Sequence, residues 1–337
     1  MDLTLNAEQE AIRSAIRDVL AERMSSARVR AVIAEAAGVD EIVWRTAGEL
    51  GWFGLGVAEK DGGAGYGLPE EMLLFLELGR AVVPGPWLGT VLAASAVHVG
   101  RADMLAGERR VAVVDDPRDV LGIGPRAGGI VHAVPDAGAA HALLVLGSRM
   151  ARLVALGDGV EVDARPSMDP TRSLATLRLH EVPATPVEAE VGALRRAAIV
   201  LAAAEAVGVA ERTVEMSVEY GKVREQFGKP IGSFQAIKHR CADMAVRAEV
   251  ARSAVIYAAV AVRDGERDAD FLVHAAKLLA SSAAVTNATD NIQNHGGMGY
   301  TWEADAHLFL KRARLLEQTF GTSAAHLDAI AAPWRAA

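Results

Sequence analysis

The C-terminal part of the chain, residues 188–337, contains three long stretches with helical periodicity, and these constrain the fold more than any other feature. They span about 188–222, 233–263 and 267–294, and shorter stretches follow at 303–318 and 323–331. Along the second long stretch apolar side chains recur every three or four residues, at Phe234, Ile237, Cys241, Met244, Ala248, Ala251 and Val255. Long helices bury such stripes against one another, so we predict an antiparallel helical bundle with Cys241 in its core.

The rest of the chain divides into a helical part and a strand-rich part. Asn6 is placed to cap a first helix, and further helices are predicted at 39–50, 68–83 and 86–99. Short β-prone runs, broken by Gly, Pro and Asp, then follow at 111–114, 142–146 and 177–179. The predicted fold class is mostly α with a small β domain. It comprises an N-terminal helical domain (1–107), a reduced middle β domain (108–187) and a C-terminal antiparallel helical bundle (188–337).

Charge and composition exclude several classes of function. The net charge is −8 and no basic run is longer than Arg195-Arg196, so a nucleic-acid partner is not expected. The single cysteine excludes an internal disulfide and a cysteine-rich metal site, which fits the cytoplasm. The apolar run 197–204 is far shorter than the roughly 18 residues of a membrane span. The N-terminus lacks the features of a signal peptide. We therefore expect a cytoplasmic protein without a membrane span.

Two motifs in the C-terminal part point to a cofactor. The first reads Arg-Glu-Gln-Phe-Gly-Lys-Pro-Ile over 224–231 and is followed by Gln235, and the second reads Gln-Asn-His-Gly-Gly-Met-Gly-Tyr over 293–300. Together they resemble the flavin-binding end of the acyl-CoA dehydrogenases. The resemblance covers most of the chain, since the segments 50–65 and 77–80 look like the family's helix-loop-helix beside the acyl pocket.

The resemblance implies that FAD is the cofactor. An arginine can pair with two pyrophosphate oxygens, and glycines keep side chains away from a cofactor. The residues that match the family's cofactor-binding positions are Arg224, Phe227, Gln235, Gln293, Gly296, Gly297 and Thr322. Gly228 suits a left-handed turn at a helix end, and Ser233 is placed to cap the next helix. His295 has no second ligand at metal-binding spacing, so we interpret it as a loop hydrogen-bonder and expect no metal site.

The same resemblance shows what the chain lacks. The family's usual catalytic base stands in a Glu-Gly-Thr motif, which reads Phe320-Gly321-Thr322 here, and an alternative base position aligns near Ala198. Neither side chain accepts a proton, so we predict no catalytic residue in this chain. The segments that hold the flavin ring in the family's β domain are also not recognisable between 108 and 187, a span without tryptophan.

Three hypotheses follow. In the first, the chain is the non-catalytic subunit of an α2β2 acyl-CoA dehydrogenase. It completes the FAD site of a second family chain that oxidises an acyl-CoA, with an electron-transfer flavoprotein as acceptor and sterol or lipid catabolism as its context by analogy. In the second, the chain is a self-sufficient homomeric dehydrogenase with a relocated base such as Glu317. In the third, it is a flavin-free scaffold or binding protein. Glu317 and Glu205 are each expected to be salt-bridged or solvated helix residues.

Overall fold

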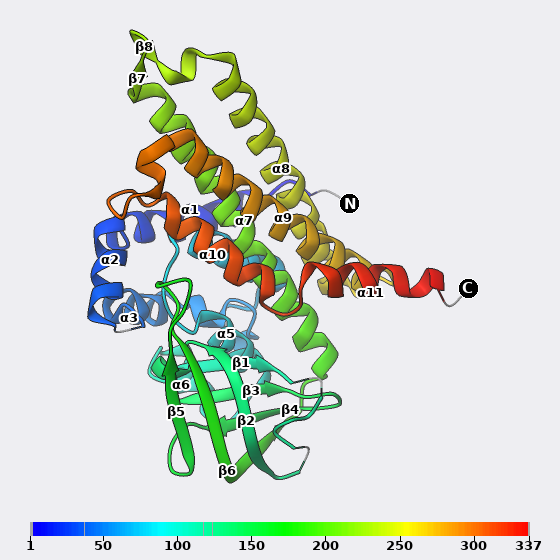
Figure 1. Ribbon diagram of the computed structural model, residues 1–337. Helices are drawn as coiled ribbons and strands as arrows, with labels where there is room; N and C mark the ends of the chain where they lie inside the picture. Colours follow the sequence, from blue (N-terminus) through cyan, green and yellow to red (C-terminus); the bar gives the residue numbers. More distant parts are fainter. Residues whose placement is uncertain (1–2, 37, 117, 123, 336–337) are drawn as a thin grey trace. The chain divides into compact units, whose positions relative to one another are not determined.

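The computed structural model describes residues 3–36, 38–116, 118–122 and 124–335, and its elements follow the order helices, sheet, helices (Figure 1). This confirms the predicted fold class, mostly α with a small β sheet. Among the described residues, no helix combines the length and apolar character that crossing a membrane requires.

The N-terminal helices begin with a capping box. The side-chain oxygen of Asn6 accepts the N–H of Gln9 at 2.8 Å, and the Gln9 side chain accepts the N–H of Asn6 at 3.1 Å, which confirms the predicted cap. The α-helices are α1 (Ala7–Arg23), α2 (Ser26–Glu35), α3 (Glu41–Glu49), α4 (Leu68–Arg80), α5 (Trp87–Ala96) and α6 (Arg101–Leu105), with the short 3₁₀ helices η1 (Trp52–Gly54) and η2 (Glu59–Asp61). The predictions missed α2, which buries only Val29 and Val32, and α6, which is little more than one turn.

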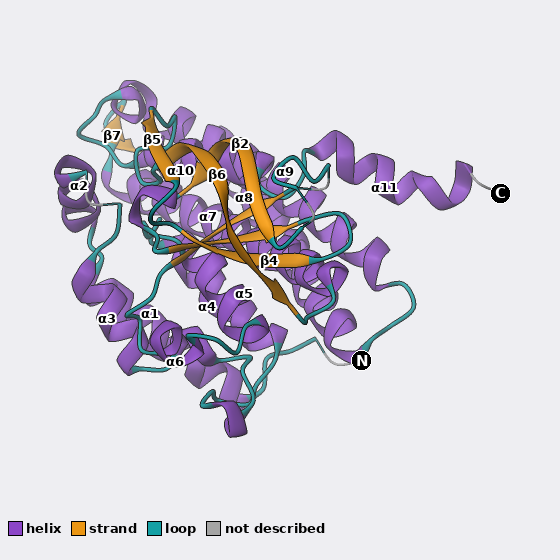
Figure 2. Cartoon of the chain, turned by 90° about the horizontal axis from the view of Figure 1, so that it is seen from below, coloured by secondary structure: helices purple, strands orange, loops and turns teal. Residues whose placement is uncertain are grey.

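The middle of the chain forms a six-stranded sheet in the order β1-β3-β4-β6-β2, with β5 also paired to β6 (Figure 2). The strands are β1 (Val111–Asp115), β2 (Arg126–Pro135), β3 (Ala142–Leu146), β4 (Ala151–Ala155), β5 (Val160–Arg165) and β6 (Leu174–Val187), and a 3₁₀ helix η3 (Ala137–Ala139) follows β2. Strands β1 and β3 are parallel and the other pairs antiparallel. The predictions missed β2, β4 and β5. Strands β2 and β5 are largely exposed, so they lack an apolar run.

The C-terminal part contains the predicted long helices, α7, α8 and α9, which lie side by side in Figure 1. Its elements are α7 (Val191–Val223), β7 (Glu225–Gln226), β8 (Lys229–Pro230), η4 (Ile231–Ser233), α8 (Gln235–Asp264), α9 (Ala269–His295), η5 (Gly296–Tyr300), α10 (Ala306–Gln318) and α11 (Ser323–Arg335). The apolar stripe of α8 is buried from Met244 onward, whereas Ile237 and Cys241 nearer its start are only half-buried. The prediction that Cys241 is a core residue was therefore wrong.

Two local predictions at the start of α8 were also wrong. Ser233 ends η4, and Phe234 takes the N-cap position of α8 without a side-chain hydrogen bond. Gly228 does adopt a left-handed conformation, with φ +74°, but it does so in the turn between β7 and β8. Phe227 beside it has φ +54°, as a two-residue hairpin turn requires. The hairpin, rather than the end of α7, sets this backbone geometry.

The chain forms two compact units. The first comprises Met1–Glu22, Met72–Val82 and Ile199–Ala337, and the second comprises Arg23–Glu71 and Val83–Ala198. Helix α1 and most of α4 thus belong with the C-terminal helices. The predicted division into three consecutive domains stays a prediction.

Within the first unit, α4 and α7 touch backbone to backbone. A side-chain carbon added to Gly79 would collide with the carbonyl oxygen of Glu205, and one added to Gly208 with that of Leu76. Buried Glu77 on α4 accepts hydrogen bonds from Arg13 and Arg17 at 2.7–3.0 Å and forms a third ion pair with Arg80 at 3.2 Å. Glu77 is therefore a structural ion-pair centre of this unit.

Candidate functional site

The first predicted motif forms an exposed hairpin between α7 and α8. The backbone N–H of Arg224 donates to Tyr220 O at 2.9 Å, and Arg224 O accepts the N–H of Ile231 at 2.8 Å, so the hairpin base is closed. The Arg224 side chain is exposed, and among the described residues no carboxylate forms a salt bridge with it. Phe227 is 92 % exposed, and its ring meets Phe234 edge-on at 6.0 Å. An exposed guanidinium and an exposed aromatic ring thus lie in the same hairpin.

The second predicted motif is the end of α9 and the turn after it. Gln293 is exposed on the last turn, and Gly296 ends the helix with φ +59° and ψ −138°, a conformation that favours glycine. Open space surrounds Gly296 and Gly297, so a ligand could approach their backbone. At Gly299, in contrast, a side-chain carbon would lie 2.6 Å from Ile292 O, so this glycine is needed for packing.

Contacts between α7, α8 and α9 bring the two motifs to the same end of the first unit. Ser217 on α7 donates to the buried side chain of Asn291 at 2.8 Å, and the Tyr220 ring stacks on His295 with centroids 4.2 Å apart. The Nδ1 atom of His295 lies 2.8 Å from Asn291 O, so His295 is a hydrogen-bonding residue of the turn. Arg240 on α8 donates to Asn294 at 2.8 Å. These contacts hold the end of α9 against the helices that carry the hairpin.

Gln235 joins this group and Thr322 does not. Gln235 is exposed in the first turn of α8, directly after the hairpin. Thr322 precedes α11, and its hydroxyl caps that helix by accepting the N–H of Ala325 at 3.2 Å. The next turn of α11 contacts α9 through His326 and His274, and His274 is about 28 Å along the helix axis from Gln293. Within one chain, Thr322 is therefore separate from the other predicted cofactor residues.

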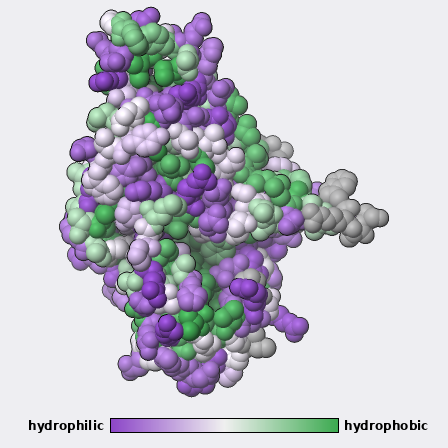
Figure 3. Space-filling model, viewed as in Figure 1, coloured by the Kyte–Doolittle hydropathy of each residue, from purple (hydrophilic) through white to green (hydrophobic). Residues whose placement is uncertain are grey.

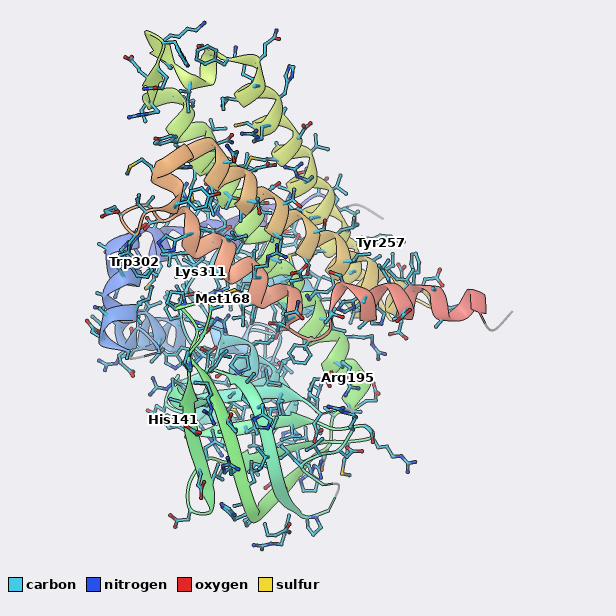
Figure 4. All side chains as sticks on the ribbon, in the orientation of Figure 1. His141, Met168, Arg195, Tyr257, Trp302 and Lys311 are labelled. Atoms are coloured by element: carbon cyan, nitrogen blue, oxygen red, sulfur yellow. The ribbon has the colours of Figure 1, made fainter. Side chains whose placement is uncertain are left out.

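The two positions matched to a catalytic base carry no proton acceptor. Phe320 lies between α10 and α11, half-buried and with φ +56°. Ala198 is fully buried in α7. Near it on α7, Arg195 pairs with Asp115 on β1 at 2.9 Å and donates to Gly147 O at 2.9 Å (Figure 4). This start of α7 is thus a structural anchor of the second unit.

The nearby carboxylates are engaged in ion pairs. Glu205 is buried and pairs with the fully buried guanidinium of Arg312 at 2.6 Å. Glu317 is half-buried and pairs with Arg314, three residues earlier on α10, at 3.0 Å. The prediction that Glu205 and Glu317 are salt-bridged helix residues is confirmed. Each of these carboxylates therefore has a cationic partner in the structure.

Nitrogen groups lie beside the segment that contains Phe320, together with the Glu317 carboxylate, which interacts with Lys277. The buried ammonium of Lys277 donates to Ser281 Oγ at 2.9 Å and to Leu316 O at 2.8 Å, and burial lowers its pKa to about 8. His326 lies 2.8 Å from His274 between their Nδ1 atoms. Burial and the Lys277 charge lower the pKa of His326 to about 4. His326 is thus neutral and only weakly basic near neutral pH.

The second motif continues into an aromatic and cationic surface. Trp302 is 55 % exposed, stacks on His307 with centroids 4.7 Å apart, and lies under the Lys311 ammonium at 5.2 Å (Figure 4). The cation–π contact stabilises the indole in one position. The structure therefore orders the segment after η5 through side chains of α10.

Sequence reasoning missed the buried carboxyl group of Glu71 in the second unit, whose pKa is raised. Glu71 is buried, accepts a hydrogen bond from the backbone of Gly56 and lies 3.4 Å from Ser95 Oγ. Burial raises its pKa to about 7. A side-chain carbon on Gly56 would collide with the carboxyl group. Only the fold brings Gly56, Glu71 and Ser95 together, so the sequence carries no signal for this group.

Comparisons with known proteins agree with the motifs. Residues 6–103 match the model of the N-terminal domain of acyl-CoA dehydrogenases, and residues 193–333 match that of the C-terminal domain. The chain is 37 % identical over 321 residues to acyl-CoA dehydrogenase IpdE2 of Mycobacterium tuberculosis, covering 92 % of each protein.

Two solved structures have the same fold over nearly the whole chain. One is the Tcur3481-Tcur3483 steroid ACAD G363A variant, with a TM-score of 0.90 and 27 % identity, covering 99 % of this chain and 100 % of the other. The other is the ChsE4-ChsE5 complex of Mycobacterium tuberculosis, with a TM-score of 0.89 and 25 % identity, covering 100 % of each chain. With both terminal domains matched, the chain belongs to the acyl-CoA dehydrogenase family, whose members are oxidoreductases acting on CH–CH bonds.

Proposed function

We propose that this chain is the non-catalytic subunit of a hetero-oligomeric, FAD-dependent acyl-CoA dehydrogenase of α2β2 composition. It would bind the adenine half of FAD with Arg224, Phe227, Gln235, Gln293, Gly296 and Gly297, and the partner chain would supply the catalytic base and the site of the flavin ring. When bound, the flavin accepts the hydride that leaves Cβ of the acyl-CoA. Thr322 stays a predicted cofactor residue, and within one chain it lies apart from the residues at the hairpin.

The observation that carries the proposal is the contrast between the two predicted sites. The hairpin keeps an exposed arginine that pairs with no carboxylate among the described residues, whereas the base position holds Phe320, which cannot accept a proton. A homomeric enzyme needs both functions in one chain. A subunit that completes a partner's cofactor site needs only the first.

The charge at the hairpin supports binding of a pyrophosphate. The exposed cationic side chains there are those of Lys222, Arg224, Lys229 and Lys238, in a chain with a net charge of −8. Among the described residues, none of these four side chains has a salt bridge to a carboxylate. Local positive charge in an acidic protein attracts a polyanionic ligand. Open backbone at Gly296 and Gly297 would let the ligand approach closely.

The relatives support a partner chain and suggest the substrate class. One structural neighbour is described as a steroid ACAD formed by two named proteins, and the other as a complex of two named proteins. By analogy we propose a sterol-derived or related lipid acyl-CoA as substrate, and an electron-transfer flavoprotein as electron acceptor. A cytoplasmic location is proposed from the single cysteine.

Purification with and without a partner tests the proposal. The chain expressed alone is expected to be colourless, and co-expression with a neighbouring dehydrogenase-family chain is expected to give a larger, yellow complex. Flavin absorbance and mass in solution are the measurements. A yellow homomer that acyl-CoA bleaches would replace the proposal with the self-sufficient dehydrogenase.

Arg224→Ala should release flavin from the assembled complex. A charge-assisted hydrogen bond contributes about 1.5–3 kcal/mol, so flavin affinity should fall by about 10- to 100-fold. Flavin content per complex, measured by absorbance after dilution, is the readout. Arg267→Ala is the matched control, because Arg267 is an exposed arginine remote from the hairpin in sequence, beyond the far end of α8. Equal flavin content in both variants would remove the assignment of Arg224.

Glu317→Gln should leave turnover within about threefold, because the partner chain supplies the base. The measurement is steady-state oxidation of the acyl-CoA by the complex with an artificial electron acceptor. A loss of about 10⁴-fold with flavin still bound would identify Glu317 as a relocated base. The Arg314→Gln variant controls for loss of the ion pair, since it frees the Glu317 carboxylate without removing it.

A further inference from the structure

A pocket of about 450 Å³ lies at the base of the β7–β8 hairpin, between the end of α7 and the start of α8. Its lining includes Val218, Lys222, Pro230, Ile237, Lys238 and Cys241. None of the predicted cofactor residues lines it. The volume is in the range of small-molecule sites, which are about 300–1,000 Å³.

Two glycines shape the wall of this pocket. A side-chain carbon on Gly232 would lie 2.8 Å from Gly221 O, so the hairpin segment and α7 meet through their backbones. The remaining wall is mainly apolar, from Val218, Ile237 and the Pro230 ring. Ser217, which is fully buried, already donates its hydroxyl to Asn291. The wall thus offers apolar contact with little hydrogen bonding.

The charged side chains of the lining are both lysines. Lys222 and Lys238 come from opposite walls, α7 and α8, and both are exposed. Among the described residues, neither lysine has a salt bridge to a carboxylate. An apolar cavity whose lining includes two exposed lysine side chains is complementary to an apolar molecule with one anionic end. At the top of Figure 3, hydrophilic and hydrophobic residues lie side by side on this tip of the molecule.

We propose that this pocket binds a small apolar carboxylate, with its hydrocarbon part against Val218 and Ile237 and its carboxylate near Lys222 and Lys238. The ligand would be a free fatty or alicyclic acid rather than the flavin. The bound acid would also contact the end of α7 and the start of α8, which flank the hairpin. It could therefore change the conformation of the hairpin that contains Arg224.

The thiol of Cys241 can report whether this pocket is occupied. Cys241 is the single cysteine and is part of the lining, so thiol labelling reads occupancy of this pocket alone. Burial raises the pKa of the Cys241 thiol, so labelling by neutral N-ethylmaleimide should be slow enough to follow by mass spectrometry. Decanoate at about ten times its dissociation constant should slow labelling about tenfold, because only unoccupied protein reacts. Decylamine, with the same chain and opposite charge, should not protect.

Variants separate a specific site from general charge attraction. Lys222→Glu combined with Lys238→Glu should abolish protection by decanoate, and Lys229→Glu should retain it, because Lys229 is on the same hairpin but outside the lining. Equal protection by decanoate and decylamine, or equal loss of protection in both variants, would overturn the proposal.

Two further measurements distinguish this proposal from the cofactor assignment. Protection by decanoate should be unchanged in Arg224→Ala, whatever that variant does to flavin content. If assembly with the partner chain blocks labelling without decanoate, the pocket is a subunit contact and the carboxylate site is refuted. If Cys241 still reacts with N-ethylmaleimide after assembly, and decanoate still slows this reaction, the carboxylate site is supported.

Discussion

Arg312→Met is expected to destabilise the protein by about 3–5 kcal/mol, because it would remove the guanidinium that pairs with a buried carboxylate. Arg312 is fully buried, its guanidinium lies 2.6 Å from Glu205, and it also donates to Val82 O at 3.2 Å. Removal of the guanidinium leaves the Glu205 charge in a low-dielectric interior. Urea denaturation of the purified protein, followed by helical circular dichroism, measures the loss.

A double variant tests the physical reason. Glu205→Leu combined with Arg312→Met removes both charges, and replacement of a buried pair by apolar side chains is often neutral or stabilising. The double variant should therefore recover most of the lost stability. Arg314→Met is the control on the same helix, and loss of the pair between exposed Arg314 and half-buried Glu317 should cost about 0–1 kcal/mol. A double variant less stable than Arg312→Met would show that side-chain packing, rather than charge burial, dominates.

Glu71→Gln is expected to stabilise the protein by about 3 kcal/mol above neutral pH and to have little effect in acid. The pKa of Glu71 is raised from 4.5 to about 7 by burial, so the native state favours the protonated carboxyl group. In the unfolded chain the group ionises at its ordinary pKa. As pH rises from 4.5 toward 7, native Glu71 increasingly carries a penalty that glutamine lacks, and above 7 the penalty is constant.

Denaturation midpoints at about pH 5 and about pH 8 give the difference directly. The gain of Glu71→Gln should appear at the higher pH and shrink at the lower one. Glu49→Gln, an exposed glutamate of α3, is the control and should change stability by less than about 0.5 kcal/mol. An equal gain at both pH values would mean that the glutamine improves packing, with no contribution from ionisation.

The long helices and the family could be predicted because their signals are local. The stripe along α8, the turn residues around 224–232 and the two cofactor motifs are each contained in a short segment. The missed strands show the limit of such signals. Strand β5 is stabilised by pairing with β6, while its own side chains are mostly exposed and give no apolar pattern. Strand pairing depends on a distant segment, which local periodicity does not encode.

For the candidate site, residue identities could be predicted from the sequence, whereas their arrangement in space could not. The identities of Arg224, Phe227 and Gln293 could be predicted from motif spacing, as could the absence of a carboxylate at Phe320. That the end of α9 packs against the end of α7, which leads into the hairpin, depends on the Tyr220–His295 stack and the Ser217–Asn291 hydrogen bond, which join residues about seventy positions apart.

By itself, the sequence determined the helical bundle, the family and the loss of the usual base, since each follows from residue types at short spacing. Only the tertiary structure decided that Thr322 is remote from the other cofactor residues, that Glu205 is neutralised by Arg312, and that Cys241 lines a pocket instead of the core. The physical reason is that burial, ion pairing and cavities depend on which distant segments pack together. Those distances are properties of the folded chain and have no local signature in the sequence.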